Sequence, residues 1–140
     1  MKQYPSFLKY KKYHFVNNLF FSLKAQKSFY PLNGLFCIKA IDSGKLTFKQ
    51  IEACRKSVRR NMRKDGRIWL NVFTYLPITT KGVGSRMGKG KGGHSGWICP
   101  IKKGQILCEA SGVSSIKLVH SLKRSKSKLG LTNKIFKLTY

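Results

Sequence analysis

The chain has 140 residues, of which 41% are hydrophobic and 12% aromatic, so it can form one domain with a substantial core. Twenty-nine lysines and arginines stand against four acidic residues, which gives a formal net charge of +25. A compact body with that surplus repels itself unless a polyanion neutralises it. Because the cations are spread along the whole chain, nucleic acid is favoured over an anionic membrane or an acidic protein as that polyanion.

The scarcity of acids and the pattern of cysteines disfavour several other classes of protein. Four scattered carboxylates and three histidines in unlike contexts (His14, His94 and His120) offer no acid–base pair, so no enzyme, cofactor or catalytic residue is predicted. The four cysteines form no C-x-x-C pair, which disfavours a metal site. No apolar run reaches the roughly 18 residues that a membrane span requires, and 17–23 is too short for a signal-peptide core, so a soluble chain is expected.

The first third of the chain predicts a basic arm followed by a strand. Residues 1–33 are rich in lysine and aromatic residues without clean periodicity, which indicates an irregular arm with room for one short strand. The apolar run Gly34–Ile41 then ends at the turn signal Asp42-Ser43-Gly44, which predicts a strand.

The segment after this turn predicts an amphipathic helix. Thr47 and Gln50 have the spacing of a capping box, in which each side chain bonds the other's backbone amide. Gly66 suits a position just past the end of the helix, where Arg63 and Lys64 would face the negative end of its dipole. The apolar residues at helical spacing are Phe48, Ile51, Cys54, Val58 and Met62.

The opposite face of this helix carries the cations Lys49, Lys56, Arg59, Arg60 and Arg63, spread over roughly 100°. Such a row is usually a solvated surface. Here only Glu52 lies on that side, so a surface that faces phosphates is favoured.

Two further segments predict strands. Residues 67–78 are aromatic and β-branched and predict one strand, and 97–110 predict a hairpin that turns at 102–104. If Lys103-Gly104 is the centre of a two-residue turn, Cys99 and Cys108 lie opposite one another. That arrangement permits a disulfide, but two small buried hydrophobic residues are the favoured interpretation.

The remaining elements complete an α+β fold. A second amphipathic helix is predicted to use Leu118, Val119, Leu122 and Leu129 and to end at Gly130, and a closing strand is predicted after residue 130. The order of elements predicts two helices packed on a mostly antiparallel sheet. We expect an arm over 1–33 and a single domain over 34–140.

Between two predicted strands lies a glycine-rich basic loop, residues 79–96, in which seven of the fifteen residues from Gly82 onward are glycine. The loop does not match the Walker-type phosphate-binding motif, because Val83 stands where a glycine is needed and Gly90 follows Lys89 where Ser or Thr is needed. A G-x-G-x-x-G match begins at Gly88 but neither follows a strand directly nor opens a helix, so it is coincidental.

Two interpretations of the loop remain. In the first, the loop threads between nucleic-acid backbones, and its glycines allow the main chain to approach them closely. Met87 would then lie against a base or sugar, and four cations would neutralise phosphates. Alternatively it is a mobile surface loop, which four cations without counter-charge disfavour. The cations are Lys81, Arg86, Lys89 and Lys91.

Several motifs together resemble a known family. "LTFKQIEACRKSVRR", "GRIWLNVF", "PIT", "RMGKGKG" and "GQILCEASGV", in this order and spacing, resemble large-subunit ribosomal protein sixteen of the bacterial type. The resemblance runs from about residue 34 to 113, more loosely to 138. It implies a hammerhead-like α+β body on large-subunit rRNA and a loop extending toward aminoacyl-site tRNA near the peptidyl-transferase centre.

The resemblance also implies partners and site residues. The partners are large-subunit rRNA, tRNA and neighbouring ribosomal proteins, in a chain that is not a homo-oligomer. Expected on rRNA are Lys9, Lys11, Lys12, Lys49, Lys56, Arg59, Arg60, Arg63, Lys64 and Arg67. Expected to face tRNA or rRNA from the loop are Lys81, Arg86, Met87, Gly88, Lys89, Gly90 and Lys91.

Two departures from the family bear on origin and function. The arm is rich in lysine and aromatic residues where the family has arginine and glycine, and lysines outnumber arginines 22 to 7. That usage suits an AT-rich genome and favours a mitochondrial ribosome over a plastid or bacterial one.

The alternative functions are a free-standing RNA chaperone or translation factor and, less favoured, a phosphate-transfer enzyme.

Overall fold

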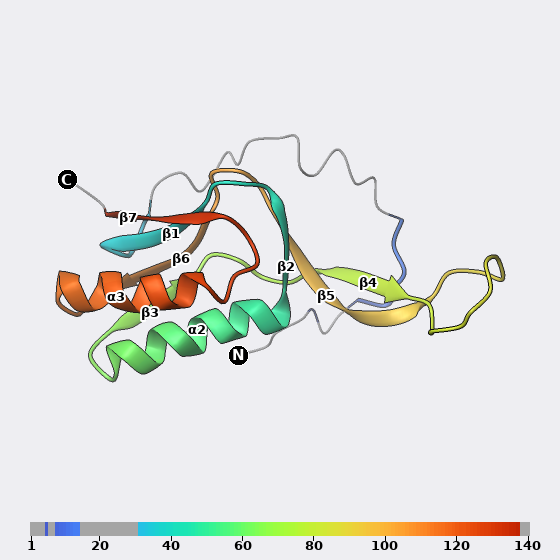
Figure 1. The fold of residues 1–140 in the computed structure, drawn as a ribbon, viewed down its shortest axis with the longest axis horizontal. Helices are drawn as coiled ribbons and strands as arrows, with labels where there is room; N and C mark the ends of the chain where they lie inside the picture. The colour runs from blue at the N-terminus through green and yellow to red at the C-terminus, as the bar shows by residue number, and fades with distance from the viewer. Residues whose placement is uncertain (1–4, 6–7, 15–30, 138–140) are drawn as a thin grey trace.

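The computed structural model describes residues 5, 8–14 and 31–137, drawn in colour in Figure 1. The expected short strand in the arm lies largely outside these residues, and positions 8–14 form no strand. No helix in the described ranges is long and apolar enough to cross a membrane. The elements are β1 Phe36–Ala40, β2 Gly44–Thr47, α2 Phe48–Met62, β3 Arg67–Leu70, β4 Leu76–Thr80, β5 Gly93–Ile101, β6 Ile106–Ser111, α3 Ser115–Lys126 and β7 Asn133–Lys137.

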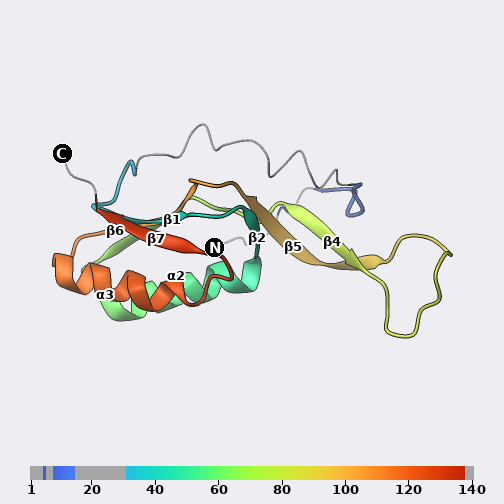
Figure 2. The ribbon, with the colours of Figure 1, turned by 45° about the horizontal axis from the view of Figure 1, so that its top comes forward.

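The strands form two sheets rather than the single sheet expected, and the α+β class is confirmed. One sheet has the order β3-β6-β1-β7 and the other the order β2-β5-β4, and every pairing is antiparallel among the strands described. Helices α2 and α3 lie side by side on one face of the four-stranded sheet (Figures 1 and 2). The three-stranded sheet extends away from this body and carries the glycine-rich loop at its far end.

Helix α2 forms as its sequence predicts. The backbone N–H of Thr47 donates to Gln50 Oε1 at 2.9 Å, and the N–H of Gln50 donates to Thr47 Oγ1 at 3.4 Å, which completes the capping box. The apolar stripe from position 51 to position 62 is buried, whereas Phe48 at its start is half-buried. Burial of this stripe in the core therefore leaves the opposite, polar face of α2 toward solvent.

The end of α2 differs in detail from the expectation. The helix stops at Met62, and Arg63, not a glycine, takes the positive backbone angle of φ 56° that reverses the chain. Gly66 serves a different need, because a Cβ at that position would lie 2.6 Å from the Cβ of Met62. Its lack of a side chain lets the next segment turn closely around the helix.

Helix α3 is shorter than expected, and three of its four predicted apolar residues, Leu118, Leu122 and Leu129, are buried. It ends at Lys126 rather than at Gly130, and Val119 is 38% exposed instead of packed in the core. The residues it buries are Leu118, Ser121, Leu122 and Ser125. Two serines on the packed face explain the weak apolar signal, since each satisfies its own hydroxyl on a helix carbonyl at 2.8 Å.

The prediction of one strand over 67–78 is wrong. Residues 67–70 pair with β6 in the four-stranded sheet, and residues 76–80 pair with β5 in the other. Between them the Asn71 side chain donates to Glu109 Oε1 at 2.6 Å, Val72 and Thr74 are buried, and the chain crosses from one sheet to the other. The sequence analysis also did not predict β2, which is only four residues long.

The predicted hairpin over 97–110 is also wrong in its pairing. The turn is present, with the N–H of Gln105 donating to the carbonyl of Lys102, but β5 and β6 belong to different sheets. Cys99 and Cys108 are therefore not cross-strand neighbours. Both are buried free thiols, which confirms the small-hydrophobe interpretation.

Candidate nucleic-acid interface

The exposed face of α2 is the first cationic region. Lys49, Lys56, Arg59, Arg60 and Arg63 are all exposed, as predicted. One of them also has a structural contact, because Arg59 donates to the carbonyl of Gly66 at 2.8 Å and braces the turn after the helix. Lys64 in this turn and Arg67 at the start of β3 are exposed as well.

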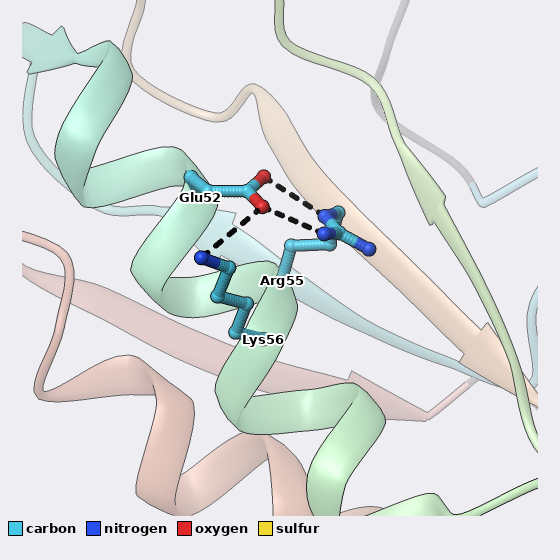
Figure 3. Close-up of polar contacts among 3 residues, drawn as sticks. All are labelled: Glu52, Arg55 and Lys56. Carbon is cyan, nitrogen blue, oxygen red and sulfur yellow. Dashed lines mark hydrogen bonds and ion pairs between the residues drawn. The ribbon is translucent and has the colours of Figure 1, made fainter. Parts of the chain in front are cut away.

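The single acid on this helix is engaged by two neighbours. Figure 3 shows Glu52 between Arg55 and Lys56, with Arg55 donating to both carboxylate oxygens at 2.9 and 2.6 Å and Lys56 Nζ at 3.9 Å. The hydrogen bond from Arg55 is the main reason that the pKa of Glu52 lies below its ordinary value, and the same contact raises the pKa of Arg55. Glu52 thus orders two side chains but offsets only one of the charges on α2.

The loop between β4 and β5 is the second cationic region. The strands extend into the predicted loop from both sides, so only residues 81–92 lie outside them. Every residue from 81 to 91 is exposed, and the Met87 side chain is 99% exposed. None of the four loop cations forms an ion pair with a carboxylate of the described chain.

Backbone geometry explains the glycines of this loop. Gly88, Lys89 and Gly90 have φ of 82°, 51° and 90°, three successive residues in the left-handed region that favours glycine. Lys81 Nζ donates to the carbonyl of Gly88 at 2.7 Å and holds this turn against the start of the loop. The turn leaves its main chain without covering side chains, open to a close neighbour.

The third cationic region is the described part of the arm, residues 8–14, which lies beside the base of the loop rather than beside α2 (Figure 1). Lys12 Nζ donates to the carbonyl of Lys91 at 3.4 Å, and Lys91 Nζ donates to the carbonyl of Tyr13. Lys9 and Lys11 are exposed, with Lys9 5.8 Å from the centre of the Tyr10 ring. Among the predicted site residues, the structure therefore brings Lys12 of the arm together with Lys91 of the loop.

The sequence analysis missed a fourth group of cations. Arg124 and Lys128, at and just beyond the end of α3, face Lys56 and Arg60 of α2 across a groove. A basic last turn was visible in the sequence as Lys123, Arg124 and Lys126. Which of them would meet α2 depends on how the two helices pack, which the sequence pattern does not give.

The remaining polar candidates have structural roles. Glu109 is 1% exposed and accepts hydrogen bonds from the N–H groups of Leu32, Asn33 and Gly34 and from the Asn71 side chain. His94, in β5, lies 4.9 Å from the Trp97 ring. Within the described ranges no three His, Cys, Asp or Glu residues gather as metal ligands would.

A basic α+β body with a cationic helix face, a bare glycine loop and a cationic arm defines a polyanion-binding protein. Residues 5–136 match the sequence model of the family described as ribosomal protein L16p/L10e. The chain therefore belongs to this family, and the resemblance drawn from its motifs is confirmed. As a ribosomal protein of this family it is structural and not an enzyme.

Its relatives include bacterial and plant proteins. The chain is 44% identical over 98 residues to large ribosomal subunit protein uL16 of Petrotoga mobilis, with 70% of each chain covered. It is 41% identical over 98 residues to the protein of the same name in Kosmotoga olearia, again with 70% of each covered. Large ribosomal subunit protein uL16m of Marchantia polymorpha is 41% identical over 104 residues, which cover 74% of this chain and 77% of the relative.

Proposed function

We propose that this chain, a structural constituent of the large ribosomal subunit, holds large-subunit rRNA with its helix face and arm and extends its loop toward aminoacyl-site tRNA. The observation that carries the proposal is the absence of a carboxylate partner for any loop cation in the described chain. A cation cluster of this kind is stabilised when phosphates replace the missing counter-charge.

The geometry of the loop supports an RNA partner over an acidic protein. The left-handed turn at 88–90 exposes backbone amides that can approach phosphate oxygens closely, and Arg86 and Lys89 add charge beside them. The exposed Met87 side chain would lie against a base or sugar. Residues 8–14 of the arm, which contact the loop through Lys12 and Lys91, extend the same surface.

The proposed site keeps the two groups expected from the sequence. The rRNA-facing group comprises Lys9, Lys11, Lys12, Lys49, Lys56, Arg59, Arg60, Arg63, Lys64 and Arg67. The tRNA- or rRNA-facing group comprises Lys81, Arg86, Met87, Gly88, Lys89, Gly90 and Lys91. We further propose that residues 1–33 act as the arm of a single domain over 34–140 that assembles as one copy.

We also propose that the ribosome in question is mitochondrial. The ratio of 22 lysines to 7 arginines supports an AT-rich genome. A plant relative whose name carries the suffix m is as similar over its matched length as the Kosmotoga protein. Fractionating the source organism and probing mitochondrial and cytoplasmic ribosomes with an antibody would decide between the compartments.

Sedimentation through a sucrose gradient tests the central proposal. The chain should co-sediment with large subunits and whole ribosomes, and dissociate from them as the salt concentration rises. If it remained at the top of the gradient at low salt, the alternative of a free-standing RNA chaperone or translation factor would replace the proposal. Cross-linking from the loop to tRNA in stalled ribosomes would test the loop assignment separately.

A further inference from the structure

A basic groove lies between α2 and α3. It has a volume of about 900 Å³, and four cations line it: Lys56 and Arg60 from α2, and Arg124 and Lys128 from the end of α3 and the residues after it. The two helices run side by side on one face of the four-stranded sheet (Figures 1 and 2). All four lining cations are exposed, so the groove is open to solvent. It is separate from the loop, which lies at the other end of the molecule.

The groove carries charge that the acids of the described chain compensate at only one of its four cations. No carboxylate lines it, and Glu52, one turn from Lys56, reaches only that one of the four cations. Arg60, Arg124 and Lys128 form no ion pair within the described chain. Four like charges on facing walls repel one another, and an anion that enters the groove would relieve this repulsion.

The shape and the lining of the groove favour one kind of anion. Lys56 and Arg60 are four residues apart on one helix, a rise of about 6 Å, so they present a row of charge rather than a single point. Arginines on both walls suit phosphate oxygens approached from two sides. Ser57, Asn61 and Ser127 make the rest of the lining polar, which does not suit a lipid chain or an apolar helix.

We propose that the groove between α2 and α3 binds a ribose-phosphate strand of large-subunit rRNA, with Arg60 and Arg124 contacting phosphates from opposite walls. This inference rests on the proposed function, because it specifies which surface of the ribosomal protein takes rRNA. It adds Arg124 and Lys128 to the site and makes the helix pair, rather than α2 alone, the unit that binds. Contacts to the backbone position the protein and are independent of base sequence.

The first test compares two double variants of the full chain that lose the same charge. Arg60→Gln/Arg124→Gln removes one cation from each wall, and Lys117→Gln/Lys123→Gln removes two exposed lysines of α3 that lie outside the groove. The probe is large-subunit rRNA of Petrotoga mobilis made by transcription, with binding measured from low to moderate salt. Circular dichroism of each variant verifies that it is folded.

Counterion release sets the expected size of the effect. Losing two phosphate contacts should lower the slope of log K against log salt by about 1.4 to 1.8, and weaken binding roughly 25- to 60-fold at 0.1 M salt if the contacts contribute nothing at 1 M. The control variant should lose only a few-fold, from the change in net charge. Equal losses in the two variants would overturn the groove assignment and leave rRNA binding itself intact.

A second measurement locates the RNA. All four native cysteines are buried, so Ser127→Cys would provide the reactive thiol at the groove for attachment of an iron chelate that cleaves nearby RNA. Cleavage confined to a short rRNA segment supports the proposal. A bound complex with no cleavage from position 127 would overturn the groove assignment, whereas a wild-type chain that does not bind rRNA would remove the proposed function as well.

Discussion

The buried carboxylate of Glu109 should be the most sensitive point of the fold. Its Oε2 accepts N–H groups of Leu32, Asn33 and Gly34 at 3.1, 2.8 and 3.0 Å, and its Oε1 accepts Asn71 Nδ2 at 2.6 Å. Hydrogen bonds to a charged group contribute about 1.5–3 kcal/mol each, against about 0.5–1.5 kcal/mol for neutral ones. Glu109→Gln should therefore lower the free energy of unfolding by about 2–4 kcal/mol, allowing for non-additivity.

The same group makes the stability depend on pH. Burial acts to raise the pKa of Glu109, but the hydrogen bonds from Asn33, Asn71, Gly34 and Leu32 outweigh it, so the pKa lies below its ordinary value. A lowered native pKa means that the stabilisation is complete above the unfolded pKa, about 4.3 for glutamate, and is lost as the pH falls through the native pKa. Glu109→Gln should remove this contribution to the pH dependence of the free energy of unfolding.

Urea unfolding followed by circular dichroism measures both effects, at neutral pH and at steps down to acid pH. Glu52→Gln is the matched control, because its carboxylate is bonded on the surface of α2 and its loss should change stability by less than about 1 kcal/mol. The reasoning is refuted if Glu109→Gln unfolds within about 0.5 kcal/mol of the wild type at neutral pH and keeps the same acid dependence.

Three further variants test the loop, the cap of α2 and the backbone. Arg86→Ala/Lys89→Ala should leave the melting temperature unchanged, because both side chains are exposed, but should reduce translation in a reconstituted system; an unfolded variant would make the loop part of the core. Thr47→Ala should cost about 1 kcal/mol in urea unfolding by removing the helix cap, and no loss would contradict the capping box. Gly112→Ala should cost at least about 1 kcal/mol, since φ is 92° and a Cβ would lie 2.7 Å from the carbonyl oxygen of Asp65; an unchanged unfolding midpoint would show that the backbone relaxes.

Local signals in the sequence predicted the elements whose determinants are local. The capping pair Thr47 and Gln50 and the stripe of α2 involve residues three or four apart, so the pattern contains the answer. Pairing partners are different, because the turn at Lys102 has the same sequence whether or not β5 and β6 face each other. The run over 67–78 likewise reads as uniformly strand-forming, and only the bond from Asn71 to Glu109 shows where it leaves one sheet for the other.

The residues of the candidate site also divide into those that the local sequence predicts and those that depend on tertiary packing. Exposure of the loop cations follows from glycines that leave nothing to bury, so composition alone placed Lys81 to Lys91 outside the core. The groove cations Arg124 and Lys128 could not be predicted from composition, because their significance comes from facing Arg60 on another helix. That juxtaposition depends on Ser121 and Ser125, small side chains on the buried face of α3, which a search for apolar periodicity passes over.

The fate of the four acids explains why so much positive charge remains on the surface. Glu109 is used inside the fold and Glu52 is bonded to its own helix, whereas Asp42 and Asp65 are exposed near turns. The fold therefore needs only two carboxylates, and the surface has almost none to offset its lysines and arginines. Since mutual repulsion of these cations destabilises the isolated chain, their retention is understandable only if stability is completed by a polyanion, as the phosphates of rRNA would do.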